Sequence, residues 1–303
     1  VFADIELETF NIDLESIIRN ITPRTKAIIA VDIFGHPVDM TGLRDISKKY
    51  KIKIISDTAQ APLAKYNGSL AGTLADIGGF SLNYHKHIHT GEGGILVTND
   101  DDLAQRMQLI RNHAEAAVAG MGVKNISNLL GFNFRLGEIE CAIGIEQLKK
   151  LKGLVTKRQN SAKILHEGLK DLEGIRMPVT KKGCSHVYYL FPMILDTEKI
   201  QVSRNEVVEA LRAEGVDGLI EGYANIHMLP MYQRKIAYGS NGFPWNADFC
   251  ERDVSYAKGI CPNAEKLHDE TFFGYQMCLH DLSDSDANLI VEAFRKVWKL
   301  LLG

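Results

Sequence analysis

Short apolar runs alternate with helical patterns along the first half of the chain. The runs are rich in β-branched residues and lack polar alternation, as expected of strands that are covered on both faces. They stand at 27–33, 52–57, 76–82 and 94–98. Residues 40–50 and 101–112 follow a helical pattern. This alternation predicts an α/β fold with a mostly parallel sheet flanked by helices.

A long helical tract at 136–172, with apolar residues at Ile139, Ile143, Leu148 and Leu151, leads into a second pattern of strand and helix. Residues 187–195 predict an apolar strand, and Ser203 with Glu206 forms a capping box that opens a helix. The last helix, at 286–302, carries one apolar stripe, formed by Ile290, Phe294, Val297 and Leu301. These elements predict a smaller C-terminal α/β domain.

A chain of 303 residues is long enough for two domains, and we expect a large domain at 1–152 and a small one at 153–303. The net charge of -3 gives no electrostatic reason to expect a nucleic-acid partner. No apolar stretch is long enough to cross a bilayer, so we expect no membrane partner. The five cysteines show no paired spacing, which indicates reduced thiols and a cytoplasmic protein. Because the sequence opens at Val1 in a strand-like pattern, we expect the N-terminal portion of the large domain to be missing.

Candidate chemistry follows the predicted strands of the first half. Lys86 lies in a polar, histidine-rich stretch at 83–92 between two strands, and Asp57 ends an earlier strand. Ligands of mostly parallel sheets bind beyond the carboxyl ends of the strands. A lysine in such a place can condense with an aldehyde, although most lysines are solvated surface residues.

A pyridoxal 5′-phosphate (PLP) hypothesis gives roles to the neighbouring polar residues. If Lys86 holds PLP, a carboxylate must keep the pyridine nitrogen protonated, and Asp57 is suitably placed. Gln60 can reach the ring hydroxyl, and Ser81 can donate to the phosphate. Each has a structural alternative, since an aspartate caps loops, a glutamine is usually polar surface and a serine can satisfy the backbone.

The joint order of these residues resembles the DegT-type sugar aminotransferases, which are fold-type I PLP-dependent enzymes. The motifs that carry the resemblance include Asp57-Thr58-Ala59-Gln60-Ala61, then Ser81 and Lys86 followed by Thr90-Gly91-Glu92-Gly93-Gly94, and finally Gly131-Phe132-Asn133-Phe134-Arg135-Leu136. It implies a Schiff base between PLP and Lys86, with Asp57 and Gln60 at the ring and Ser81 and Asn133 at the phosphate. In family members the segment with Asn133 comes from the neighbouring subunit, so a homodimer with a shared active site is implied.

The resemblance also implies an activity. Lys86 would move protons while an amino group passes from glutamate to a keto-sugar, expected to be nucleotide-linked. Such a reaction serves amino-sugar and polysaccharide or lipopolysaccharide biosynthesis. Arg135, His227 and Trp245 are candidate substrate residues; Arg135 could also meet the phosphate or pair in the subunit interface, and Trp245 could pack on its own domain.

Three alternatives compete with this interpretation. Some relatives carry histidine in place of the lysine and are sugar 3-dehydratases; counting back from Gly91 places Lys86, not His87, at the anchoring position. His85, His87 and His89 would share one face if they lay on a strand, which suggests a metal site, but no carboxylate or cysteine completes it. Finally, no Gly-Ser-Gly-Thr-type turn for the phosphate occurs in the sequence, so a truncated protein with impaired cofactor binding is the third alternative.

Overall fold

The computed structural model describes residues 1–115 and 129–302, and the chain divides into two compact units. The parallel-sheet unit consists of Lys26–Lys157 and Lys182–Tyr189. The antiparallel-sheet unit consists of Val1–Thr25, Arg158–Lys181 and Leu190–Gly303. The expected boundary between residues 152 and 153 stays a prediction.

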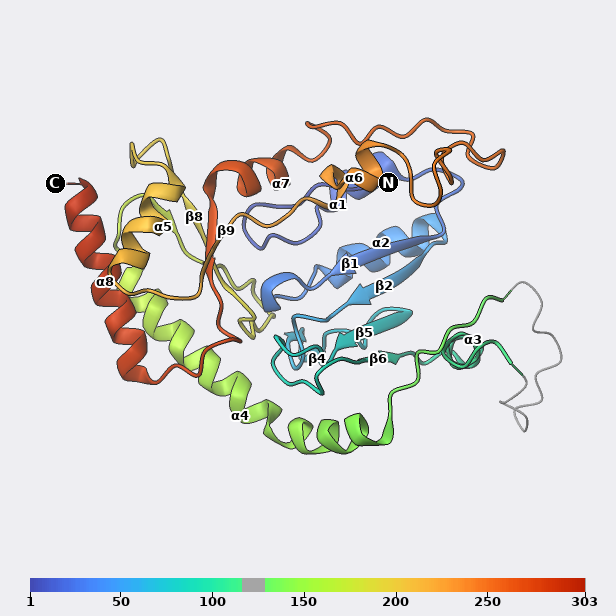
Figure 1. The fold of residues 1–303 in the computed structure, drawn as a ribbon, viewed down its shortest axis with the longest axis horizontal. Coiled ribbons are helices and arrows are strands. Elements are labelled where there is room, and N and C mark those ends of the chain that lie inside the picture. Colours follow the sequence, from blue (N-terminus) through green and yellow to red (C-terminus); the bar gives the residue numbers. More distant parts are fainter. Residues whose placement is uncertain (116–128, 303) are drawn as a thin grey trace. The chain divides into compact units, whose positions relative to one another are not determined.

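Three parallel strands and one antiparallel strand form the main sheet of the parallel-sheet unit, in the order β1-β2-β5-β6 (Figure 1). The predicted mostly parallel sheet is therefore confirmed. The strands of this unit are β1 (Ala27–Val31), β2 (Lys53–Asp57), β3 (Lys65–Tyr66), β4 (Ser69–Leu70), β5 (Ile77–Ser81) and β6 (Gly94–Val97). Its helices are η1 (Ile33–Gly35), α2 (Met40–Tyr50) and α3 (Asp101–Arg111), and α4 (Glu138–Leu169) contributes residues to both units.

Local signals explain where these elements begin and end. The side chain of Asp39 accepts the backbone N–H groups of Thr41 and Gly42 and so caps the N-terminus of α2. At the other end Lys51 adopts the left-handed conformation, with φ of 55°, which stops the helix. Between the caps, Leu43 and Ile46 are buried. The predicted helix at 40–50 thus has the predicted bounds.

The antiparallel-sheet unit has a four-stranded sheet in the order β7-β8-β10-β9. Its strands are β7 (Ile175–Arg176), β8 (Phe191–Leu195), β9 (Leu219–Glu221) and β10 (Phe272–Tyr275). Its other elements are α1 (Leu14–Asn20), α5 (Arg204–Ala213), η3 (Ile226–Met228), α6 (Pro230–Gln233), α7 (Pro262–Lys266), η4 (Leu267–Thr271) and α8 (Asp284–Leu302). Among the described residues, no helix combines the length and apolar character needed to span a membrane.

Most sequence-based elements of this unit are confirmed. The capping box is present, because Ser203 binds the backbone of Glu206 and the Glu206 side chain binds the backbone of Ser203. The apolar stripe of α8 is buried at Ile290, Phe294 and Val297, whereas Leu301 is only half-buried. The strand predicted at 187–195 is shorter and begins at Phe191, because Tyr188 has a φ of 53° that no strand accommodates.

A close approach of two backbones fixes the position of β5. A Cβ atom added to Gly78, which lies within β5, would stand 1.7 Å from the carbonyl oxygen of Gly72. The next residue, Gly79, has room, because its added Cβ would meet nothing nearer than 3.5 Å. Only glycine therefore lets the segment that ends at Gly72 lie against β5 at this point.

Three buried histidines, His36, His87 and His186, cluster in the parallel-sheet unit. His186 stacks on the ring of Tyr188 at 4.1 Å, and its Nδ1 accepts the backbone N–H of Tyr188 at 3.0 Å. His87 Nε2 lies 2.9 Å from the carbonyl oxygen of Val187. Burial, reinforced by His36 and His87, holds the pKa of His186 well below its ordinary value. The folded chain therefore keeps His186 neutral.

Gly78→Ala is expected to lower the free energy of unfolding by about 1–3 kcal/mol, because the new methyl group overlaps the Gly72 carbonyl. Gly79→Ala is the matched control and should have a much smaller effect. Urea denaturation of both variants measures the difference. Equal stability of the two variants would show that the Gly72–Gly78 approach does not constrain the fold.

Acid should destabilise the chain through His186. Below about pH 6.5 the unfolded chain binds a proton at this residue that the folded chain does not. Each further unit by which the pH is lowered therefore reduces the free energy of unfolding by up to about 1.4 kcal/mol. Denaturation at several pH values between about 5 and 7 should show a shallower dependence for His186→Gln than for the parent chain. His89→Gln, at an exposed histidine, is the control. An unchanged slope in His186→Gln would contradict this assignment.

Candidate active site

The segment from Asn83 to Gly93 forms turns that carry Lys86 between β5 and β6. Two backbone hydrogen bonds close the base of this segment. The N–H of Leu82 donates to the carbonyl oxygen of Gly93 at 2.9 Å, and the N–H of Thr90 donates to the carbonyl oxygen of Leu82 at 3.0 Å. Lys86 is partly buried, and its Nζ lies 4.6 Å from the centre of the Tyr189 ring. Burial, and then the charge of Lys86, lowers the pKa of His85. The lysine thus stands against an aromatic face beside a histidine that resists a second positive charge.

The turn structure removes the geometric basis of the metal hypothesis. His85, His87 and His89 do not lie on a strand, and they differ in exposure: His87 is buried, His85 partly buried and His89 exposed. Within residues 1–115 and 129–302, no group of three histidine, cysteine or acidic side chains could hold a metal ion.

Asp57 and Gln60 occupy the end of β2 and the turn that follows it. Asp57 is the last residue of the strand, and its Oδ1 accepts the backbone N–H of Ala59 at 3.1 Å. Gln60 is buried, and its Oε1 accepts the backbone N–H of Phe34 at 2.7 Å. The amide of Gln60 is therefore held in a defined orientation, and the alternative of a polar surface residue is wrong for this glutamine.

Ser81 ends β5, the parallel neighbour of β2. Its Oγ accepts the backbone N–H of Asn83 at 3.2 Å, and a hydroxyl that accepts one bond still carries a hydrogen to donate. Parallel strands end at the same edge of a sheet, so Asp57 and Ser81 share one edge; Gln60 comes three residues after Asp57, and Lys86 five residues after Ser81. The two segments that carry these four residues therefore leave the sheet at one edge, and the roles of the four residues toward PLP stay predictions.

Asn133 and Arg135 lie beside the end of α3 and are exposed. Arg135 donates from Nε to Asn133 Oδ1 at 3.1 Å and from Nη1 to Asn112 Oδ1 at 2.8 Å. Asn112 and Asn133 also form an isolated β-bridge. These bonds fix the two predicted residues relative to each other on the surface of the parallel-sheet unit. Their roles toward phosphate or substrate stay predictions.

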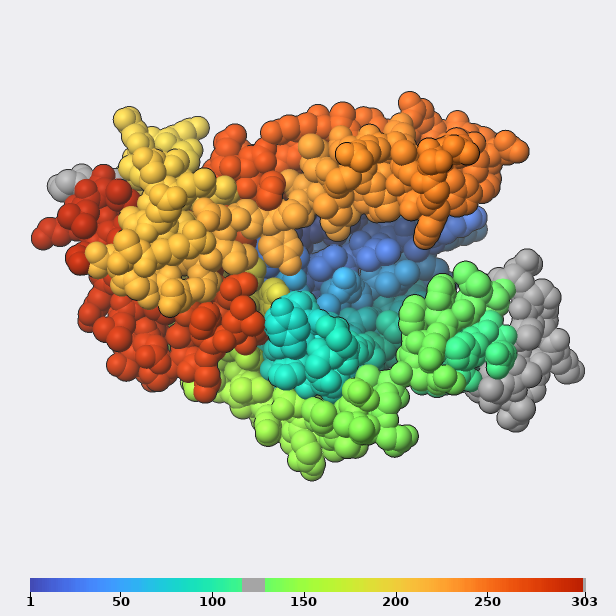
Figure 2. All heavy atoms as spheres, in the orientation of Figure 1, coloured from blue at the N-terminus to red at the C-terminus, as the bar shows by residue number. Residues whose placement is uncertain are grey.

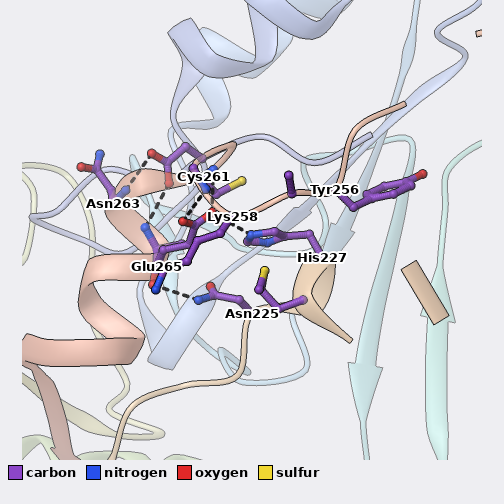
Figure 3. A network of polar contacts seen from close by, with 12 residues as sticks. Asn225, His227, Tyr256, Lys258, Cys261, Asn263 and Glu265 are labelled. Atoms are coloured by element: carbon purple, nitrogen blue, oxygen red, sulfur yellow. Dashed lines mark hydrogen bonds and ion pairs between the residues drawn. The ribbon is translucent and has the colours of Figure 1, made fainter. Parts of the chain in front are cut away.

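His227 belongs to a buried polar network of the antiparallel-sheet unit, and Figure 3 shows its ring directed at Glu265. His227 Nε2 lies 2.8 Å from Glu265 Oε1. Glu265 also accepts the backbone N–H groups of Gly259 at 2.7 Å and Cys261 at 3.2 Å. Burial alone would raise the pKa of Glu265, but these backbone bonds and His227 hold it below its ordinary value. The network ties η3 to the start of α7.

Trp245, the third candidate substrate residue, packs on aromatic neighbours of its own unit. Its Nε1 donates to the Tyr256 hydroxyl at 3.1 Å, and its ring lies edge-on to those of Tyr232 and Tyr256. These are the contacts that the packing alternative requires. The substrate roles of His227 and Trp245 stay predictions.

Sequence reasoning missed three residues of these surroundings. Asp32 is a fully buried carboxylate that follows β1, Tyr189 faces Lys86, and Glu265 pairs with His227. Burial raises the pKa of Asp32, with Asp57 adding to the effect, although hydrogen bonds from Thr58 and other donors oppose it. Asp32 left a signal, since it interrupts the apolar run at 27–33. Tyr189 and Glu265, by contrast, pair with residues that are far from them in the sequence.

Known proteins similar to this chain agree with the family that the sequence motifs indicate. The model of the DegT/DnrJ/EryC1/StrS aminotransferase family matches residues 1–272. The chain is 33% identical to the uncharacterized protein MJ1066 of Methanocaldococcus jannaschii, over 84% of this chain and 67% of the relative. It is 30% identical to the GDP-perosamine synthase of Vibrio cholerae, over 92% of this chain and 74% of the relative.

A solved structure supports the same relationship. The crystal structure of S. venezuelae DesV superposes with a TM-score of 0.81 at 26% identity, over 99% of this chain and 72% of DesV. The resemblance and the fold class expected from the sequence are thereby confirmed. The chain belongs to the DegT/DnrJ/EryC1/StrS aminotransferase family.

Proposed function

We propose that this aminotransferase uses PLP to move an amino group from glutamate to a nucleotide-linked keto-sugar in amino-sugar biosynthesis. The observation that carries the proposal is the shared edge of β2 and β5, from which Asp57, Gln60, Ser81 and Lys86 arise. The relative named GDP-perosamine synthase supports a nucleotide-linked sugar as substrate. A glutamate donor is the finer part of the proposal and rests on the family resemblance.

The donor set at this edge fits PLP group by group. The Lys86 amine suits an aldehyde, the Asp57 carboxylate suits a protonated pyridine nitrogen, and the Ser81 hydroxyl suits a phosphate. Gln60, fixed by Phe34, would orient the ring. When bound, PLP supplies an electron sink for the bond changes at the amino donor.

Lys86 would act at Nζ, first as the anchor of PLP and then as the base that moves a proton. A base must release its proton again, so the surroundings of Nζ matter. The Tyr189 ring, 4.6 Å away, would stabilise the amine while it is protonated. His85, whose pKa is lowered by burial and by Lys86, would stay neutral and so avoid repulsion beside the cation.

A second copy of the chain would complete the site. Of the four apolar residues noted on α4 in the sequence, only Leu151 is buried, whereas Ile139 is 75% exposed. Figure 2 shows this part of the chain, in green, at the molecular surface. The exposed apolar side chains of the same region are Leu130, Phe132, Phe134, Ile139, Ile143, Ile145 and Leu148. Burying them in a homodimer would also bring Asn133 and Arg135 to the partner subunit's cofactor, as the family resemblance implies.

The proposed reaction is tested by incubating the PLP-loaded chain with glutamate and a panel of nucleotide-linked keto-sugars. An amino-sugar nucleotide should form, and Lys86→Ala should lower its rate by about 10²–10⁴-fold, because the base is lost. Lys48→Ala, at an exposed lysine of α2, is the control and should leave the rate unchanged. A deoxygenated keto-sugar without amine transfer would favour the dehydratase alternative, and full activity of Lys86→Ala would overturn the role of this lysine.

The proposed dimer is tested by sedimentation of Ile139→Asp, which places a charge on the exposed apolar surface. The dimer dissociation constant should rise at least about tenfold, since burying an unpaired carboxylate is unfavourable. Lys48→Asp, on the exposed face of α2, should leave the constant unchanged. A parent chain that sediments as a monomer at all concentrations would contradict the shared site.

A further inference from the structure

Asp32 is a buried carboxylate to which the proposed reaction gives no part. It follows β1 directly and is 1% exposed. Its Oδ2 accepts the hydroxyls of Thr58 at 2.7 Å and Ser56 at 3.1 Å, and its Oδ1 accepts the backbone N–H of Val38 at 2.9 Å. Burying a carboxylate is unfavourable even with such partners, so its position calls for an explanation.

The first consequence concerns Asp57, which stands between the two hydroxyl residues. Side chains alternate along an extended chain, so Ser56 and Thr58 point to one side and Asp57 to the other. Because Asp32 holds both hydroxyls, it fixes the side on which the Asp57 carboxylate emerges. The backbone adds to this, since Asp32 donates its N–H to the Asp57 carbonyl oxygen at 2.9 Å.

The second consequence concerns Gln60. The bond from Val38 to Asp32 closes the turn that contains η1, and within that turn Phe34 has a φ of 57°. Phe34 is also the residue whose N–H binds Gln60 Oε1. Asp32 thus supports the turn that orients Gln60 as well as the strand end that orients Asp57.

We propose that Asp32 is a positioning residue that aligns Asp57 and Gln60 for PLP; the inference rests on the proposed function of that site. Asp32 acts through these two neighbours and does not touch the cofactor itself. Its carboxylate joins the end of β2 to the turn after β1 at a single point. Removing it should therefore change how PLP is held, in addition to any effect on stability.

The test measures the dissociation constant of PLP and the pH dependence of its visible absorbance band in Asp32→Ala. The dissociation constant should rise at least about tenfold, because the hydroxyls of Ser56 and Thr58 lose their common acceptor. The absorbance band should titrate at a shifted pH, which loss of stability alone would not cause. Asp32→Asn should recover most of the affinity, since its amide can accept from Val38 and donate to the hydroxyls. Asp45→Ala, at an exposed aspartate, is the control.

Two further variants decide the matter if Asp32→Ala does not fold. Thr58→Val and Ser56→Ala should each weaken PLP binding in the same direction, by about threefold to tenfold, and shift the same titration. Folded variants that bind PLP with the parent's affinity and band would overturn the inference while leaving the proposed function intact. Failure of the parent chain to bind PLP through Lys86 would instead overturn both.

Discussion

Parallel pairing of β1, β2 and β5 is the constraint on which the candidate site depends. The register places Asp57 opposite Val31 on one side and Gly79 on the other. Because the three strands run in one direction, the residues that follow each strand lie at the same edge of the sheet, although these residues are distant from one another in the sequence. A slip of one residue would turn Asp57 to the opposite face. The missing side chain at Gly78 allows the close backbone contact beside this register.

Buried polar groups hold the turns beyond this edge. His87, the neighbour of Lys86 in sequence, binds the Val187 carbonyl, and Asp32 ties the turn after β1 to the end of β2. Such groups are unfavourable to bury unless each finds a partner, so their bonds permit few alternative arrangements. Lys86 and Gln60 therefore lie in turns with fixed shapes. A reactive amine must be positioned in this way.

Much of this fold could be predicted from the sequence because its signals are local. Apolar runs identified β1, β2, β5 and β6, and a single capping box located the start of α5. The order of Asp57, Gln60, Ser81 and Lys86, together with the glycine motifs, indicated the family, and the fold places Asp57 and Ser81 at neighbouring strand ends. Local patterns could not show which apolar residues of α4 stay exposed, since periodicity does not reveal what covers a helix. Nor could they pair His227 with Glu265 or Lys86 with Tyr189, because only the folded chain brings those residues together.

The proposed function depends above all on Lys86 as the residue that anchors PLP. Its most direct test is borohydride reduction of the PLP-loaded chain, followed by proteolysis and mass spectrometry of the peptides. One pyridoxyl-labelled lysine is expected, Lys86, in the peptide that contains Tyr84 and His85. A label on another lysine, or complete reduction without any labelled peptide, would contradict it.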